Sequence, residues 1–219
     1  MPTLQKDKPD TARKFIWASG THIGLIRKQN QDLIYPEHDG QDYGPLLVAV
    51  ADGCGGLPHG DWASSLAIQE AIAAKGTVKD RVLAANKAVF SKKVGMATTL
   101  TIVELLPDGT ANIGHLGDSR AYLFREGKLY QITRDHTVGH ALIWAVGYRR
   151  SPRVDVLQLK LANGDRLLLC SDGLTCMLTD TQIADIVKSG TPLEVVENLI
   201  EAANKAGGYD NISVVLVDA

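Results

Sequence analysis

Four aspartates mark places where apolar, strand-like runs end or begin. Asp52 ends the run LLVAVAD, Asp118 lies in NIGHLGDS, Asp172 follows RLLLCS, and Asp210 precedes the last apolar run. An aspartate at a strand end is often only a turn residue, as in the Asp108–Gly109 turn of this chain. Paired strands can also bring several such ends to one edge of a sheet, whereas an aspartate in a solvated turn does not require other carboxylates nearby. We therefore expect these carboxylates to converge.

A cluster of carboxylates without histidine or cysteine indicates a site for hard divalent cations. Like charges at one place repel one another unless cations neutralise them, and oxygen ligands select Mg²⁺ or Mn²⁺ over zinc or copper. Two such ions about 3.5–4 Å apart can lower the pKa of a bridging water towards about 7 and present hydroxide to phosphorus. Arg27, five positions before Asp32, either supplies a planar fork for two phosphate oxygens or is a solvated loop residue.

Several short motifs follow one another along nearly the whole chain. They are Arg27–Asp32 (RKQNQD), Ala51–Gly56 (ADGCGG), Met96–Leu100 (MATTL), Gly117–Arg120 (GDSR), Thr133–His136 (TRDH), Gly164–Asp165 (GD), Ser171–Leu174 (SDGL) and Asp210–Asn211 (DN). Each motif is weak alone. Their order and spacing together resemble the metal-dependent serine/threonine protein phosphatases of the type 2C (PPM) family, in particular compact bacterial members with a shortened flap.

The resemblance implies a core site with two Mn²⁺ or Mg²⁺ ions. Asp52 would bridge both ions, with the Gly53 carbonyl on the first and with Asp172 and Asp210 on the second. Asp32 would bind a metal ion directly or through water.

Three further roles are implied in the same way. Asp118, together with Asp172, matches a third and looser metal position. Asn211 matches the residue that orients metal-bound water, and Arg27 matches the arginine that binds the substrate phosphate. The catalytic residues expected from the resemblance are therefore Arg27, Asp52 and Asn211.

The chain departs from the family pattern in three places. Gln31 stands where the family often has a glutamate, which predicts weaker metal binding. Cys54 stands where some members carry a histidine proposed to protonate the leaving alkoxide, so the general acid is open. Residues 137–163 form a shortened flap region that lacks the usual His-Pro-x-Arg-Asn stretch, and Ala141–Gly147 is expected to be the remnant of the final flap helix. This shortening affects substrate choice more than chemistry.

Helical periodicity predicts two helices over Asp61–Ala74 and Lys79–Phe90, and capping boxes at Thr179 and Thr191 predict two more near the C-terminus. Turn residues predict two successive antiparallel hairpins in the middle of the chain, which we interpret as a meander. Strands grouped between pairs of helices predict an α+β fold with segregated layers. The resemblance implies a four-layer α/β/β/α sandwich, with two central antiparallel sheets flanked by helix pairs.

The composition is that of a globular domain, with 45% hydrophobic and 22% charged residues. The net charge is -2, so no overall positive field attracts nucleic acid or anionic lipid, and no apolar run reaches the roughly 20 residues of a membrane span. The three cysteines form no CxxC pair, which favours a reducing compartment. We predict a cytoplasmic monomer with a polar leader over residues 1–14 and one catalytic domain over residues 15–219.

The predicted activity is hydrolysis of phosphoserine and phosphothreonine in proteins by direct attack of a dimetal-activated hydroxide, without a phosphoenzyme. A counteracting serine/threonine kinase is the implied partner. Two alternatives stay open: a catalytically silent binding module with the type 2C fold, and a phosphatase that acts on a small phosphate ester.

Overall fold

The computed structural model describes residues 12–139 and 141–219, and within them two antiparallel sheets stack face to face. One sheet contains β1 (Phe15–His22), β3 (Gly40–Asp42), β7 (Arg120–Arg125), β8 (Lys128–Gln131), β12 (Arg166–Cys170) and β13 (Ile212–Asp218), in the order β3-β1-β13-β12-β7-β8. The other contains β2 (Asp32–Tyr35), β4 (Leu46–Asp52), β5 (Leu100–Leu105), β6 (Thr110–Leu116) and β11 (Asp155–Lys160), in the order β11-β6-β5-β4-β2. A short hairpin consists of β9 (Thr137–Val138) and β10 (Ala141–Leu142).

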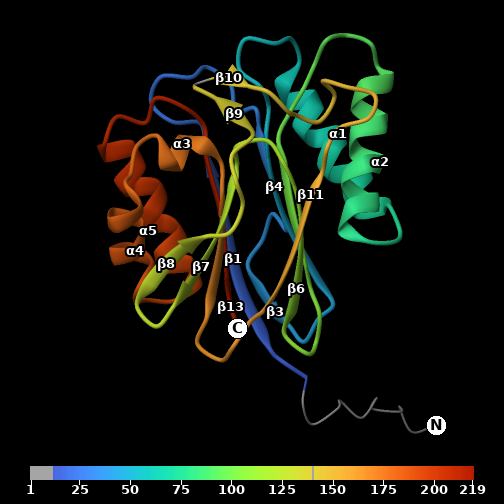
Figure 1. The fold of residues 1–219 in the computed structure, drawn as a ribbon. Coiled ribbons are helices and arrows are strands. Elements are labelled where there is room, and N and C mark those ends of the chain that lie inside the picture. Colours follow the sequence, from blue (N-terminus) through green and yellow to red (C-terminus); the bar gives the residue numbers. More distant parts are fainter. Residues whose placement is uncertain (1–11, 140) are drawn as a thin grey trace, which may run out of the picture.

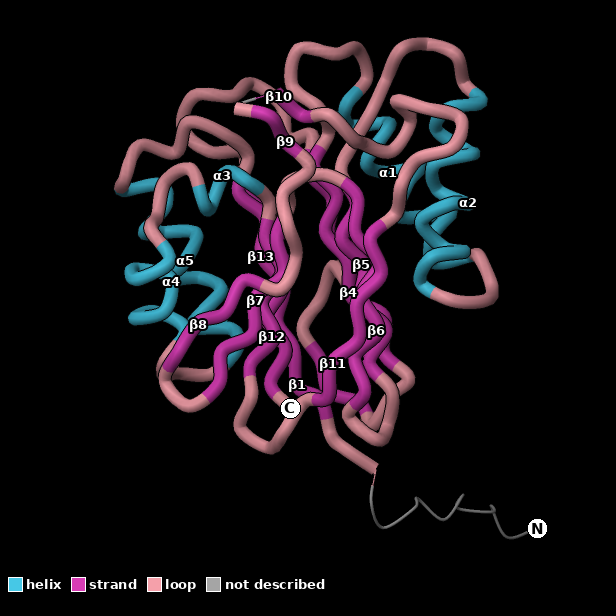
Figure 2. The backbone as a smooth tube through the Cα atoms, in the orientation of Figure 1, coloured by secondary structure: helices cyan, strands magenta, loops and turns pink. Residues whose placement is uncertain are grey.

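Helices cover the outer face of each sheet (Figure 1). The five-stranded sheet carries α1 (Gly60–Ala73) and α2 (Val78–Ser91), and the six-stranded sheet carries α3 (Asp172–Thr175), α4 (Asp180–Val187) and α5 (Pro192–Lys205). The capping boxes predicted at Thr179 and Thr191 are both formed. The predicted four-layer α/β/β/α sandwich is confirmed, and Figure 2 shows its layers as helix, strand, strand and helix.

The central strands are apolar on both faces, because one face packs against the other sheet and the other face packs under helices. In β13, Val215 and Val217 pack between the two sheets, whereas Val214 and Leu216 pack under the helices. Successive side chains of a strand point to opposite faces, so a strand buried on both faces needs a continuous apolar run. The sequence of β13, ISVVLVD, has this character.

The predicted central meander is wrong, although both hairpins within it are correct. The β5–β6 hairpin belongs to the five-stranded sheet and the β7–β8 hairpin to the six-stranded sheet, so the chain changes sheets between Leu116 and Arg120. Gly117 has φ +129, and a Cβ there would lie 2.5 Å from Cβ of Thr99. This crossing puts Asp118 between the two sheets rather than in a turn within one sheet.

The expected flap helix over Ala141–Gly147 is also wrong. Its backbone groups are used for other pairings: the amide of Ile143 donates to the carbonyl of His136, and Val146 exchanges both backbone hydrogen bonds with Thr98. Gly147 has φ +93, which ends any helical course. The apolar run Ala141–Gly147 resembles a helix in sequence, but its backbone pairs with Thr98 instead.

Of the predicted leader over residues 1–14, residues 1–11 lie outside the described part of the chain, and β1 begins at Phe15. In the described residues, no helix has the length and apolar character needed to cross a membrane. The β9–β10 hairpin and α3 lie at the same end of the sandwich, opposite the C-terminus (Figure 1). The candidate site is found at this end.

Candidate active site

The four aspartates at the strand ends converge on one cavity of about 290 Å³. Its lining residues are Arg27, Asp52, Cys54, Gly55, Thr99, Asp118, Leu142, Tyr148, Asp172 and Asp210. They come from segments spread over most of the chain, which the two stacked sheets bring to one end. The convergence expected from the sequence is therefore present for all four carboxylates.

Each carboxylate is positioned by an element boundary. Asp52 is the last residue of β4, and Asp32 is the first residue of β2, directly opposite Asp52 in the antiparallel register. Directly opposed residues point to the same face of a sheet, so Asp32 lies beside Asp52. Asp172 opens α3 immediately after β12, and Asp118 lies at the crossing between the sheets.

Asp52 and Asp172 perturb each other at the centre of the cluster. Desolvation raises the pKa of Asp52 well above the usual range, and the neighbouring carboxylates of Asp32 and Asp172 raise it further. Desolvation and Asp210 also raise the pKa of Asp172, against which a hydrogen bond with Asp52 acts to lower it. Like charges brought together away from water raise one another's pKa values in this way.

Asp32 and Asp118 are perturbed for the same reasons. Burial raises the pKa of Asp32 to about 6, and the hydroxyls of Ser213 and Ser171 lie near enough to lower it in part. Neither hydroxyl meets the geometry of a hydrogen bond, so both buried carboxylate oxygens of Asp32 are without a hydrogen-bond partner. Burial and the charge of Asp172 raise the pKa of Asp118 to about 6.

These observations fit the chemistry of a hard divalent cation. The cluster offers carboxylate oxygens, two of them buried and unpaired, and burial and mutual repulsion raise the pKa values of Asp52 and Asp118. The side chains surround the cavity without closing on one point: in residues 12–139 and 141–219, no three His, Cys, Asp or Glu side chains are arranged as ligands of one ion. An ion would have to draw them together.

Position 53 has no room for a side chain, so only glycine fits there. A Cβ on Gly53 would lie 2.4 Å from the carbonyl oxygen of Gly60 and 2.8 Å from that of Gln31. The amide of Gly53 donates to the same Gln31 carbonyl, which ties the end of β4 to the start of β2. The Gln31 side chain packs against Gly60, where a Cβ would lie 2.9 Å from Cδ of Gln31.

Arg27 lies at the edge of the cavity and pairs with Asp210. Its Nη2 donates to Oδ2 of Asp210 at 2.6 Å, and the arginine side chain is 43% exposed. This hydrogen bond, with the charges of Asp210, Asp52 and Asp172, raises the pKa of Arg27. The guanidinium is thus a fixed cation facing both the carboxylates and solvent.

Asn211 holds the loop that carries Arg27. Its Nδ2 donates to the carbonyls of Ile23 and Gln29, and its Oδ1 accepts from the amide of Gln31. Both amide hydrogens and one oxygen lone pair are used in this way. The second lone pair of Oδ1 is the part of the side chain left for orienting water, the role predicted from the sequence.

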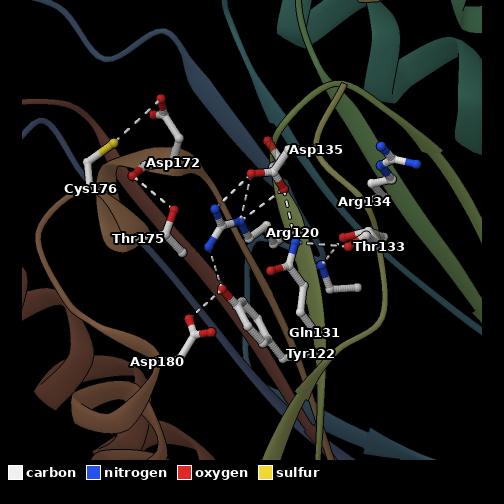
Figure 3. Close-up of polar contacts among 12 residues, drawn as sticks. Arg120, Tyr122, Gln131, Thr133, Arg134, Asp135, Asp172, Thr175, Cys176 and Asp180 are labelled. Atoms are coloured by element: carbon white, nitrogen blue, oxygen red, sulfur yellow. Dashed lines mark hydrogen bonds and ion pairs between the residues drawn. The ribbon is translucent and has the colours of Figure 1, made fainter. Parts of the chain in front are cut away.

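Figure 3 shows a polar network around Arg120. Arg120 donates to both carboxylate oxygens of Asp135 and to the hydroxyl of Tyr122, which in turn donates to Asp180. Asp180 belongs to the turn of helix that begins α4, shortly after Asp172. The network therefore joins the strand after Asp118 to the helical segment after Asp172.

The flap region contributes two lining residues that the sequence did not indicate. Leu142 of β10 and Tyr148, in the loop after it, both line the cavity. Tyr148 lies against Cys54, whose thiol pKa is raised to about 12 by burial and by Asp118. The position of Tyr148 depends on the pairing of Val146 with Thr98, and no motif in the sequence indicates it.

The sequence was compared with known families and with relatives of known name. A sequence profile described as "Stage II sporulation protein E (SpoIIE)" matches residues 42–219. Protein phosphatase PhpP from Streptococcus pneumoniae is 33% identical over 235 residues, which cover 90% of this chain and 94% of PhpP. This chain belongs to the PPM (type 2C) family of serine/threonine protein phosphatases.

Solved structures of the PPM family have the same fold. PppA, a regulatory component of the type VI secretion system in Pseudomonas aeruginosa, matches with a TM-score of 0.85 and 28% identity, covering 95% of this chain and 99% of PppA. The catalytic domain of the PPM phosphatase PstP, solved with two manganese ions, matches with a TM-score of 0.80 and 32% identity, covering 93% of this chain and 98% of that domain. The predicted family and fold are confirmed.

Proposed function

We propose that this PPM-family chain hydrolyses phosphoserine and phosphothreonine in proteins, using two Mn²⁺ or Mg²⁺ ions. One observation carries the proposal: four aspartates line a single cavity, and Arg27 at its edge pairs with one of them, Asp210. The two manganese ions in the PstP catalytic domain support a dimetal site in this family.

The residues that would hold the ions follow from the cluster. Asp52, at its centre, would bridge them, with the Gly53 carbonyl on one ion and Asp172 and Asp210 on the other. Asp32 would bind an ion directly or through water, and its two unpaired oxygens leave it free to do so. Asp118 with Asp172 would form a third, looser position.

When bound, such ions supply a hydroxide nucleophile near neutral pH and neutralise charge on the phosphate. Arg27 would bind two phosphate oxygens, for which its guanidinium must exchange part of its contact with Asp210. Asn211 would keep the Arg27 loop in place and orient the attacking water with its remaining lone pair. The carboxylates of Asp52 and Asp172 would be deprotonated to act as ligands.

The partners follow from the reaction. A phosphatase of serine and threonine in proteins needs a phosphoprotein substrate and therefore a serine/threonine kinase that makes it. Cys54, Cys170 and Cys176 are free thiols, which fits a reducing compartment such as the cytoplasm.

Neither alternative has a specific observation in its favour. A silent binding module would have little use for a complete carboxylate cluster, and all four cavity aspartates are present. A small phosphate ester as the substrate is separated from a phosphoprotein by comparing the two directly.

The test is hydrolysis of a phosphothreonine peptide and of p-nitrophenyl phosphate with Mn²⁺, Mg²⁺ or chelator. We expect metal-dependent turnover of the peptide that falls at least about a hundredfold in Asp172→Asn, because several kcal/mol of charge stabilisation is lost. Asp185→Asn, an exposed position in α4, is the matched control and keeps wild-type turnover. Folded protein that hydrolyses neither compound in any metal would disprove the proposal.

A further inference from the structure

Exposed apolar side chains gather beside the cavity. Leu25, Ile26 and Tyr209 are each 62% exposed, and among the large hydrophobic residues of the described chain only Val138 is more exposed, at 67%. Leu25 and Ile26 directly precede Arg27, and Tyr209 directly precedes Asp210. Exposed clusters of this kind mark binding surfaces more often than scattered single residues do. We call these three residues the apolar rim.

Two contacts join the loops that form the apolar rim. The amide of Leu25 donates to the carbonyl of Gly208 at 2.7 Å, and Arg27 pairs with Asp210 at 2.6 Å. A Cβ on Gly208 would lie 2.9 Å from Cγ of Leu25, so the leucine lies over that glycine.

The ring of Tyr209 is held in the same manner. It packs on Gly207, where a Cβ would lie 3.2 Å from Cζ of the tyrosine. Leu25 and Tyr209 therefore lie against the backbone of the loop that carries Gly207 and Gly208, and Ile26 lies next to Leu25 in the chain.

We propose that the apolar rim binds the residues beside the phosphorylated residue of a protein substrate and selects substrates with large apolar residues there. The proposal rests on the proposed function, in which Arg27 binds the phosphate. Consecutive Cα atoms are 3.8 Å apart, so residues within two positions of a phosphoresidue at Arg27 come within reach of Leu25 and Ile26.

The size of the apolar rim favours a substrate segment over a second copy of the chain. A stable dimer buries about 800 Å² on each partner and involves about 20–30 residues a side. Three side chains on two loops fall well short of this, whereas a short peptide segment needs only a few contacts. The position next to Arg27 also gives the surface continuity with the phosphate site.

The experiment compares two phosphothreonine peptides that differ only beside the phosphothreonine. One carries leucine at the two positions on each side, and the other carries serine at these positions. The readout is the ratio of kcat/KM values for the two peptides with Mn²⁺, because a ratio within one protein cancels any general loss of activity. We expect the wild type to prefer the leucine peptide about tenfold, the value of burying part of one leucine.

In the double variant Leu25→Ser/Ile26→Ser, we expect the ratio to fall towards one. Tyr209→Ser, from the other loop, is an independent variant and should lower the ratio in the same direction. Val156→Ser and Tyr130→Ser are the controls, because both residues are exposed apolar side chains on β11 and β8, outside the set that lines the cavity. Both controls should keep the wild-type ratio, and circular dichroism checks that each variant is folded.

Three results would overturn the inference while leaving the proposed function intact. They are a wild-type ratio near one with both peptides hydrolysed, an unchanged ratio in both rim variants, and a wild-type dimer that Leu25→Ser/Ile26→Ser converts to a monomer. The last would assign the apolar rim to self-association. Failure of the wild type to hydrolyse any phosphate ester would instead contradict the proposed function itself.

Discussion

Burial gives the aspartates of the cavity a chemistry that they lack in water. Burial raises the pKa values of Asp52 and Asp172, and burial and the charge of Asp172 raise the pKa of Asp118 to about 6. Each of these carboxyl groups gains by exchanging its proton for a metal ion, since a divalent cation neutralises several of them at once. In the proposed function, divalent cations would neutralise these same groups.

A histidine next to this cluster is held in its neutral form. His115 is fully buried, with Nε2 donating to the carbonyl of Arg134 and Nδ1 accepting from the hydroxyl of Thr101. Burial and the neighbouring His136 ring, 4.8 Å away between centroids, lower the pKa of His115 to about 4, against small opposing effects of Asp155 and Asp135. This histidine is a structural residue whose protonation opposes folding.

The pH dependence of stability follows from that shift. The unfolded chain protonates this histidine below about pH 6.5 and the folded chain only below about pH 4, so the unfolded state binds more protons between these values. We expect the unfolding free energy contributed by His115 to fall by about 3 kcal/mol from pH 7 to pH 4.

Urea denaturation with chelator tests this as the difference between wild type and His115→Asn. We expect the variant to have a lower unfolding free energy than the wild type at pH 7, and this difference should shrink by about 3 kcal/mol at pH 4. Both proteins carry the same aspartates, so the titration of the aspartates cancels in the difference. A deficit that does not change with pH would contradict the neutral buried histidine.

At the scale of elements, one helix fixes the shortened flap. Asn86 of α2 is buried; its Oδ1 accepts from the amide of Gly147, and its Nδ2 donates to the carbonyls of Arg149 and Arg150. These bonds hold Tyr148 between them, at the wall of the cavity. A flap without helical structure thus keeps a defined conformation through this side chain and through the backbone pairing of Val146 with Thr98.

Replacing Asn86 with alanine should loosen this part of the flap. The change leaves one backbone amide and two carbonyls without their partner, which costs about 2–3 kcal/mol of unfolding free energy. Trypsin should also cleave after Arg149 and Arg150 faster than in the wild type. Asn198→Ala, at an exposed position of α5, is the control and should change neither urea denaturation nor cleavage. Equal cleavage of Asn86→Ala and wild type would show that other contacts fix the segment.

The elements that sequence patterns predicted are those with local causes. The helix observed over Gly60–Ala73 was predicted over Asp61–Ala74 from the spacing of its apolar residues, and the starts of α4 and α5 were predicted from the capping boxes at Thr179 and Thr191. Ala141–Gly147 was misjudged because its structure depends on Thr98 and Asn86, which lie far away in the chain. Tyr148 was missed as a site residue for the same reason.

At the scale of the whole molecule, the stacked sheets create the site. Asp52 and Asp172 end strands of different sheets, and the chain crosses between the sheets at Asp118. The carboxylates could be predicted from sequence because each follows or precedes an apolar run, and family motifs placed them in order. The change of sheet after β6 could not, because two hairpins in sequence look the same whether they share a sheet or face each other.

The most direct test of the metal cluster is a calorimetric titration of metal-free protein with Mn²⁺. We predict two ions bound per chain in the wild type and in the control Asp185→Asn. Asp52→Asn, which removes the carboxylate proposed to bridge the ions, should lose both ions at the concentrations that saturate the wild type. A wild type that binds no Mn²⁺ at millimolar concentration, or an Asp52→Asn variant that still binds two ions, would contradict the account.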